Sequence, residues 1–122
     1  MDLNKMIERV KKNTDPSKVG MITSHLGVVR RTSRNGREVL SIEVAYDQAA
    51  LQAIVRDIKK MPGIAEVMVE IMEGRLNVGE EIMAVVVAGD IRENVFPALV
   101  STVNRIKKEA SIKKEIRIKD KG

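Results

Sequence analysis

Apolar residues recur along the chain at two spacings, which together predict a domain of mixed helices and strands. Spacings of three and four, which place apolar side chains on one face of a helix, occur in three stretches. Two of these stretches follow an aspartate that can cap a helix, Asp2 and Asp47. The third runs from Asp90 to Ala110, where Glu93 completes a predicted capping box with Asp90. The predicted apolar faces are Leu3, Met6, Ile7 and Val10; Leu51, Ile54, Val55, Ile58 and Met61; and Phe96, Leu99, Val100, Val103, Ile106 and Ala110.

Alternating apolar and polar residues, or a short unbroken apolar run, predict the strands. Residues 82–88 are continuously apolar and are expected to form a central strand covered on both faces. Asn35-Gly36 predicts a hairpin turn between the first two strands, and Gly20 or Gly27 is expected to mark a β-bulge. Residues 74–79 are predicted to be a connecting loop. The predicted strands are 19–31, 40–46, 67–71, 82–88 and 112–118.

The resulting order is helix–strand–strand–helix–strand–strand–helix–strand over residues 1–122. It predicts a single α+β domain, with an antiparallel or mixed sheet and the helices packed on one side of it. A chain of 122 residues is long enough to bury a core and short for two domains. The longest apolar run is too short to cross a bilayer, and the first residues lack the apolar core of a signal peptide. A cytoplasmic protein without a membrane partner is therefore expected.

Lys107 occupies an unusual position, because it falls on the predicted apolar face of the third helix. It follows Val103 by four residues and Val100 by seven. Arg92 projects from the same side, one turn before Phe96. A cation on a buried face costs free energy unless an anion meets it. We therefore expect this face to meet the core at one end and an anion-binding pocket at the other.

Lys114 repeats this pattern in the last predicted strand. A period of two places it on the same face as Ile112 and Ile116, with Lys113 on the other face. Each lysine alone could instead snorkel, with its stem on apolar surface and its ammonium group in water. Two lysines and Arg92 on the apolar faces of adjacent elements favour an anion site.

The composition excludes several kinds of chemistry. One Phe, one Tyr and no Trp argue against nucleic-acid binding by base stacking. The absence of cysteine excludes thiolate catalysis, disulfides and cysteine zinc sites, and no metal or cofactor is expected. The single histidine, His25, lies in an otherwise apolar strand, which favours a structural role over a catalytic one. The net charge of +5 is concentrated from Arg105 onward and fits either a solvated surface or an anionic partner.

Short motifs between residues 20 and 115 occur in an order that one known family shares. They are a glycine-framed strand ending in arginine (20–30), Ala45-Tyr46 before a helix, a Gly-x-Leu-x-x-Gly-Glu loop (74–80), an Arg-x-x-x-Phe-x-Ala helix start (92–98), Ile106-Lys107 and Ile112-Lys113-Lys114. Each is weak alone. In this order and spacing they resemble the large, catalytic subunit of molybdopterin synthase.

The resemblance implies sulfur transfer in molybdenum cofactor biosynthesis, on a fold of the α/β-hammerhead type. In this family a small ubiquitin-like sulfur-carrier subunit inserts its C-terminal Gly-Gly thiocarboxylate into a pocket of the large subunit. The sulfur passes to cyclic pyranopterin monophosphate, which becomes the dithiolene of molybdopterin. The large subunit forms a homodimer with one small subunit at each end, which gives a heterotetramer. The lack of cysteine agrees with this, because the partner carries the sulfur.

The resemblance also implies roles for particular residues. Arg30, Arg92, Lys107 and Lys114 fall on the substrate-pocket cations of the family. The two arginines would bind phosphate or pterin oxygens through paired hydrogen bonds. Lys107 and Lys114 are the expected catalytic residues. Lys107 would transfer protons or attack a carbonyl, and Lys114 would stabilise an oxyanion or phosphate.

The sequence departs from the family at several positions, and these departures leave other functions open. Ile91 stands where the family has a histidine before the arginine, Ile71-Met72 replaces a second His-Arg pair, and Lys113 replaces a tryptophan. A catalytically silent scaffold that binds the ubiquitin-like partner, or itself, is the second hypothesis. The third is an RNA-binding module built on residues 105–121, which the shortage of aromatic residues disfavours.

Overall fold

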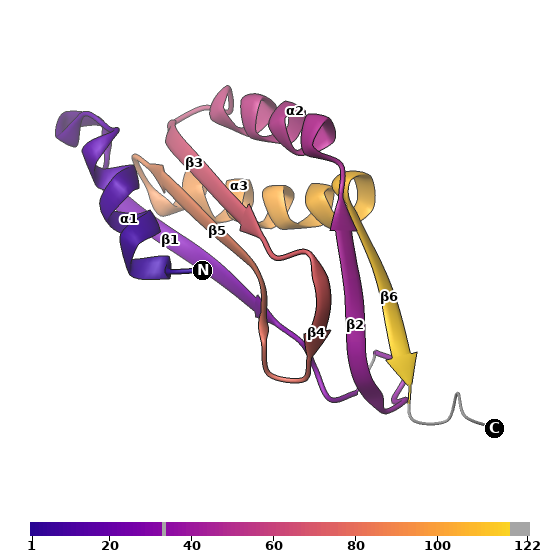
Figure 1. Cartoon of the computed structure of the whole chain (residues 1–122). Coiled ribbons are helices and arrows are strands. Elements are labelled where there is room, and N and C mark those ends of the chain that lie inside the picture. The colour runs from indigo at the N-terminus through magenta and orange to yellow at the C-terminus, as the bar shows by residue number, and fades with distance from the viewer. Residues whose placement is uncertain (33, 118–122) are drawn as a thin grey trace.

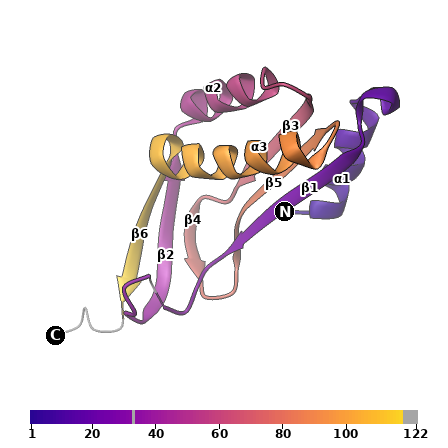
Figure 2. The same ribbon diagram turned by 180° about the vertical axis from the view of Figure 1, so that it is seen from behind.

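The computed structural model describes residues 1–32 and 34–117, and for residues 114–117 it describes the backbone alone. Within this part of the chain there are two small antiparallel sheets, and the helices pack on the first of them (Figures 1 and 2). The first sheet has the order β1-β5-β3, with bounds Met21–Val28, Glu81–Gly89 and Ile64–Ile71. The second has the order β4-β2-β6, with bounds Gly74–Asn77, Val39–Tyr46 and Ser111–Arg117. The helices are α1 (Leu3–Lys12), α2 (Gln48–Lys59) and α3 (Arg92–Arg105), with a 3₁₀ turn η1 (Pro16–Lys18) and a π turn η2 (Ile106–Ala110).

Two of the three predicted helix starts are confirmed by their caps. The Asp2 carboxylate accepts a hydrogen bond from the Lys5 N–H at 3.1 Å, and the Asp47 carboxylate accepts one from the Ala50 N–H at 3.1 Å. The capping box predicted at Asp90 is wrong, because α3 begins one residue later than that box requires. Ile91 is the N-cap residue and makes no side-chain cap. Asp90 instead accepts hydrogen bonds from the Ile91 N–H and the Asn94 amide.

The central strand β5 is covered on both faces, as its unbroken apolar run predicts. Helices α2 and α3 pack on one face and bury Val85 and Val87, while α1 packs on the other over Val86. The prediction that all helices lie on one side is therefore wrong. A strand that is apolar on both faces needs a cover on each, and α1 supplies the second with Met6 and Val10.

The predicted hairpin between the first two strands is also wrong, although the turn exists. Gly36 has a positive φ of 84°, and Thr32 pairs with Glu38 across this turn. Beyond that single bridge the flanking strands separate, because β1 pairs with β5 while β2 pairs with β4 and β6. The region predicted as a loop at 74–79 contains β4, which joins the second sheet. The β-bulge expected at Gly27 is confirmed by a register shift between Gly27 and Val28.

The second sheet extends beside one end of the first, and η2 leads from α3 directly into β6 (Figures 1 and 2). The segment that follows β1 reaches the same region on its way to β2. Residues from widely separated parts of the sequence therefore meet where the two sheets adjoin. None of the described helices is long and apolar enough to span a membrane.

Candidate functional site

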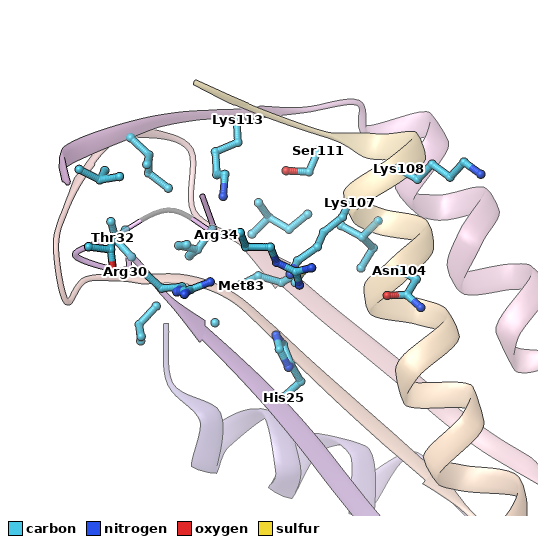
Figure 3. Close-up of a pocket in the computed structure, with 18 of the residues that line it drawn as sticks. His25, Arg30, Thr32, Arg34, Met83, Asn104, Lys107, Lys108, Ser111 and Lys113 are labelled. Carbon is cyan, nitrogen blue, oxygen red and sulfur yellow. The ribbon is translucent and has the colours of Figure 1, made fainter. Parts of the chain in front are cut away.

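A cleft of about 1410 Å³ lies where the two sheets adjoin. The end of β1, the segment after it, the turn η2 and the start of β6 all contribute to its walls (Figure 3). Its floor is apolar and includes Val29, Ile42 and Ile106, which belong to the buried core. The polar and charged residues that line it are His25, Arg30, Thr32, Arg34, Asn35, Asn104, Lys107, Lys108, Ser111 and Lys113.

The charged groups of this cleft are all basic among the residues that the structure describes. Arg30, Arg34 and Lys113 extend toward the position of Lys107, whereas Lys108 points outward at the rim (Figure 3). No described carboxylate lines the cleft to neutralise them. Partial burial lowers the pKa of Lys107, and the positive charges of Arg34, Lys113 and Arg30 lower it further. An anion placed here would relieve this repulsion, so the arrangement favours the binding of an anion.

Lys107 reaches the cleft because α3 changes geometry at its C-terminal end. The helix continues as the π turn η2, in which Ile106 is fully buried and the adjacent Lys107 lines the cleft. Three ion-pair contacts of Arg105 fix this turn. Its guanidinium donates to Asp57 on α2 at 2.8 Å, and to both carboxylate oxygens of Glu109 at 2.8 and 3.0 Å. The guanidinium thereby joins α2, α3 and η2 directly beside the site.

The apolar face predicted for the third helix is only partly correct. Val103, Ile106 and Ala110 are buried, but Phe96 and Val100 are 49% and 57% exposed. The face of α3 that packs against β5 is instead Val95, Ala98, Thr102 and Val103. The sequence pattern does not reveal this face, because Thr102 counts as a polar residue although its side chain is buried. Its hydroxyl is satisfied internally by a 2.7 Å hydrogen bond to the Ala98 carbonyl.

The structure brings together some of the predicted site residues. Arg30 and Lys107 line the same cleft. Arg92 does not, because it lies at the opposite end of α3, about 20 Å away at the helical rise per residue. Its side chain is 78% exposed and is 3.7 Å from the Glu93 carboxylate. The backbone of Lys114, in β6, pairs with Glu43 of β2, but the side chain of Lys114 lies outside the part of the chain that the structure describes.

The faces predicted for the start of β6 are reversed at two positions. Ile112 is 69% exposed, whereas Lys113, which was predicted to point away from the pocket, lines the cleft. The strand period of two residues correctly places these neighbours on opposite faces, but it does not say which of the two points toward the protein interior. The apolar isoleucine was expected to be the inward residue, and here the inward face is a cationic cleft.

Further lining residues were not singled out as site candidates from the sequence. Arg34 precedes the Asn35-Gly36 turn, and that turn brings it back over the cleft. His25 was expected to be structural, yet its half-buried imidazole projects into the cleft beneath Lys107 (Figure 3). Partial burial, followed by the charge of Lys107, lowers the pKa of this imidazole. The only available signal was its place in the glycine-framed motif that ends at Arg30.

Comparison with known proteins agrees with this fold. A family model described as MoaE protein matches residues 1–109. Solved structures that resemble the chain include a molybdopterin synthase from Staphylococcus aureus, with 20% identity, coverage of 93% of this chain and 85% of that one, and a TM-score of 0.76. A molybdopterin biosynthesis MoaE protein from Burkholderia ambifaria MC40-6 has 24% identity, covers 96% and 80%, and has a TM-score of 0.76.

A third similar structure is a protein complex of subunits 1 and 2 of the molybdopterin-converting factor from Helicobacter pylori 26695. It has 16% identity, covers 100% of this chain and 87% of that one, and has a TM-score of 0.69. Among curated proteins, none matches the chain by sequence. The solved structures establish the fold, and the family model establishes the family because it spans most of the chain. The chain therefore belongs to the MoaE protein family, the large subunits of molybdopterin synthase.

Proposed function

We propose that this protein transfers sulfur from the C-terminal thiocarboxylate of a small ubiquitin-like carrier to cyclic pyranopterin monophosphate, forming the dithiolene of molybdopterin. The observation that supports this most strongly is the cleft around Lys107, whose described charged groups are all cationic. Both proposed ligands are anionic, because one carries a cyclic phosphate and the other ends in a thiocarboxylate. The family membership agrees with a role in molybdenum cofactor biosynthesis.

The lining residues suit separate tasks in this reaction. Arg30 and Arg34 offer planar guanidinium groups, which bind phosphate oxygens in pairs. Lys107 is the proposed catalytic lysine, because its lowered pKa eases proton transfer and its charge stabilises an oxyanion. Lys114 is retained as a second catalytic lysine on the grounds of the sequence resemblance.

The proposed assembly is a homodimer of this chain with one carrier subunit at each end. Two observations support a second copy. Ile91, Phe96 and Val100 on or beside α3 are large apolar residues, yet all are about half exposed in the single chain. Arg92 lies too far from the cleft of its own chain to contact a ligand there. It would serve as a substrate-binding residue in the cleft of the other copy. The Helicobacter pylori complex of two subunits supports the carrier as partner.

RNA binding through the C-terminal basic region is not supported as the alternative. Arg105, the first residue of that region, is engaged by Asp57 and Glu109 rather than free to contact phosphates. The silent-scaffold hypothesis differs from the proposal in one respect, because a scaffold has no reason to bind the pterin.

Pterin binding therefore provides the test. We expect cyclic pyranopterin monophosphate to raise the melting temperature of the protein, and Arg30→Ala to abolish this rise. Arg9→Ala, on the far helix α1, is the matched control and should leave the rise intact. The proposal fails if the pterin has no effect on the wild type, or if the two variants respond alike.

A further inference from the structure

His25 lies in β1 opposite Val85 of the central strand, and its ring projects into the cleft (Figure 3). The space around the ring is kept open by Gly27, two residues further along the same strand. A Cβ atom on Gly27 would lie 3.5 Å from the Nε2 atom of His25, in ordinary van der Waals contact, so only a side chain longer than that of alanine would restrict the space beside this nitrogen. The imidazole makes no hydrogen bond to any other described residue.

The cleft is poor in groups that can accept a proton near neutral pH. Its arginines remain protonated at every physiological pH, and the ordinary pKa of a lysine side chain lies far above 7, although the pKa of Lys107 is lowered. The remaining polar groups of the described lining are the hydroxyls and amides of Thr32, Ser111, Asn35 and Asn104, none of which is a base. A neutral imidazole accepts protons readily in this range. Within the described lining, His25 is the one group whose ordinary pKa lies near neutral pH.

The surroundings of His25 keep the imidazole in its neutral form. The charged groups that share the cleft with it are Lys107 and Lys108 of η2, Arg30 and Arg34 from the segment after β1, and Lys113 of β6. The neighbouring part of α3 contributes the neutral Asn104, and β5 contributes the apolar Met83. Burial and the positive charge of Lys107 both disfavour a second cation, and they lower the pKa of His25 from its ordinary 6.5. The neutral form of His25 therefore predominates at pH 7.

We propose that His25 is the proton acceptor of this cleft and acts on the water that releases the carrier from its substrate. The proposal rests on the sulfur-transfer function proposed above. When the thiocarboxylate sulfur bonds to the substrate, the C-terminal carbonyl of the carrier remains attached to that sulfur as a thioester. Release then requires water to attack the carbonyl carbon.

The proposed step balances without any further reagent. The water oxygen bonds to the carbonyl carbon, and His25 takes a proton from that water. The carbon–sulfur bond then breaks, and the imidazolium returns the proton to the leaving sulfur. The products are a carboxylic acid on the carrier and a thiol on the substrate. The cations around Lys107 stabilise the negative charge that develops on the carbonyl oxygen.

The test compares wild-type protein with His25→Gln in single-turnover release of a carrier thioester, measured across pH. We expect the wild-type rate to fall on the acid side with a midpoint below 6.5. The variant should lose about 100-fold or more in rate, together with this acid limb, since general bases typically contribute 10²–10⁴-fold. Free imidazole should restore part of the rate to His25→Ala. Ser24→Ala, an exposed neighbour on β1 outside the cleft lining, is the matched control and should retain the wild-type profile.

A second measurement does not depend on any variant. His25 is the single histidine of the chain, so its imidazole can be titrated by NMR without assignment. The pKa obtained should equal the midpoint of the acid limb. A wild-type enzyme that releases the carrier with no acid limb at the NMR pKa, or a folded His25→Gln with an unchanged rate, would overturn the role of His25 and leave the proposed function standing. A wild type that forms no product would remove the proposed function itself.

Discussion

Lys107 shows how a single residue that departs from the pattern of its neighbours can indicate a binding site. A lysine in an apolar pattern has either a solvent route or an anionic partner, and the cationic cleft around Lys107 favours the partner. Nearby arginines would be unfavourable neighbours for a lysine that only covers apolar surface. The cluster raises the free energy of the empty site, and an anionic ligand recovers that free energy on binding.

The first prediction concerns the charge of Lys107. Lys107→Ala should lower sulfur transfer by about 100-fold or more, because it removes a cation next to the reacting groups. Lys12→Ala, at the exposed end of α1, should retain the wild-type rate. Product formation by the two variants, with circular dichroism to confirm folding, checks this. Equal and small effects at both positions would mean that Lys107 is ordinary surface charge.

At the scale of elements, the site depends on the junction of α2, α3 and η2, where Arg105 contacts Asp57 and Glu109. These hydrogen bonds lower the pKa of both carboxyl groups from their ordinary values of 3.8 and 4.5. A carboxyl group whose pKa is lowered by folding stabilises the folded state above its ordinary pKa. That stabilisation is lost as the pH falls through the lowered value.

The second prediction follows from the direction of this pH dependence. Arg105→Ala should lower the melting temperature at pH 7, and the difference from wild type should shrink toward zero as the pH falls below 3.8. Because the groups are solvent-exposed, high salt should also reduce the difference. Thermal unfolding followed from pH 2 to pH 7 measures both effects. Arg9→Ala removes the same charge from α1 without breaking any described ion pair, and a pH dependence in that control equal to that of Arg105→Ala would contradict the prediction.

The contact between the first sheet and α3 gives the third prediction. A Cβ atom on Gly89, at the end of β5, would lie 2.5 Å from the Gly63 carbonyl oxygen and 2.7 Å from a Val95 methyl group. The first of these is backbone and cannot rotate away. Gly89→Ala should therefore lower the free energy of unfolding by about 3 kcal/mol, the cost of overpacking. Gly36→Ala has open space and only a positive φ of 84° to accommodate, so about 1 kcal/mol is expected there. Chemical denaturation that ranks the two variants in the opposite order would contradict this.

The sequence predicts local elements well because their signals are local. The caps at Asp2 and Asp47, the bulge at Gly27 and the central strand at 82–88 all depend on residues close to them in sequence, and all are present. Which strands pair depends on contacts between distant segments. The Asn35-Gly36 turn therefore forms, while the strands on either side of it join different sheets.

The gathering of positive charge around Lys107 was predictable from the sequence, and the full set of residues that line the cleft was less so. Lys107 was identified because it stands out in its own element, and Arg30 was identified through the family resemblance. Arg34 enters the cleft through a turn, and Lys113 and His25 enter it from the faces of two strands, whose directions are set by the tertiary fold. The exposed positions of Phe96 and Val100 have a different cause, because an apolar face does not say whether its own core or another molecule will cover it.

At the scale of the whole molecule, that uncovered face of α3 gives the fourth prediction. The protein should be a dimer at micromolar concentration, because a second copy would cover Phe96 and Val100 and would bring Arg92 toward a cleft. Light scattering coupled to size exclusion measures the mass directly. A monomer mass would contradict both the proposed homodimer and the proposed role of Arg92 in the cleft of the other copy.

The central claim is that the cationic cleft performs sulfur transfer, and the mass of the pterin product tests it most directly. The purified protein is incubated with thiocarboxylated carrier and cyclic pyranopterin monophosphate, and the pterin is then analysed by mass spectrometry. We predict a product that has gained sulfur as the dithiolene, with Lys107→Ala forming little of it. A pterin of unchanged mass, obtained with folded wild-type protein and intact thiocarboxylated carrier, would contradict the proposed function.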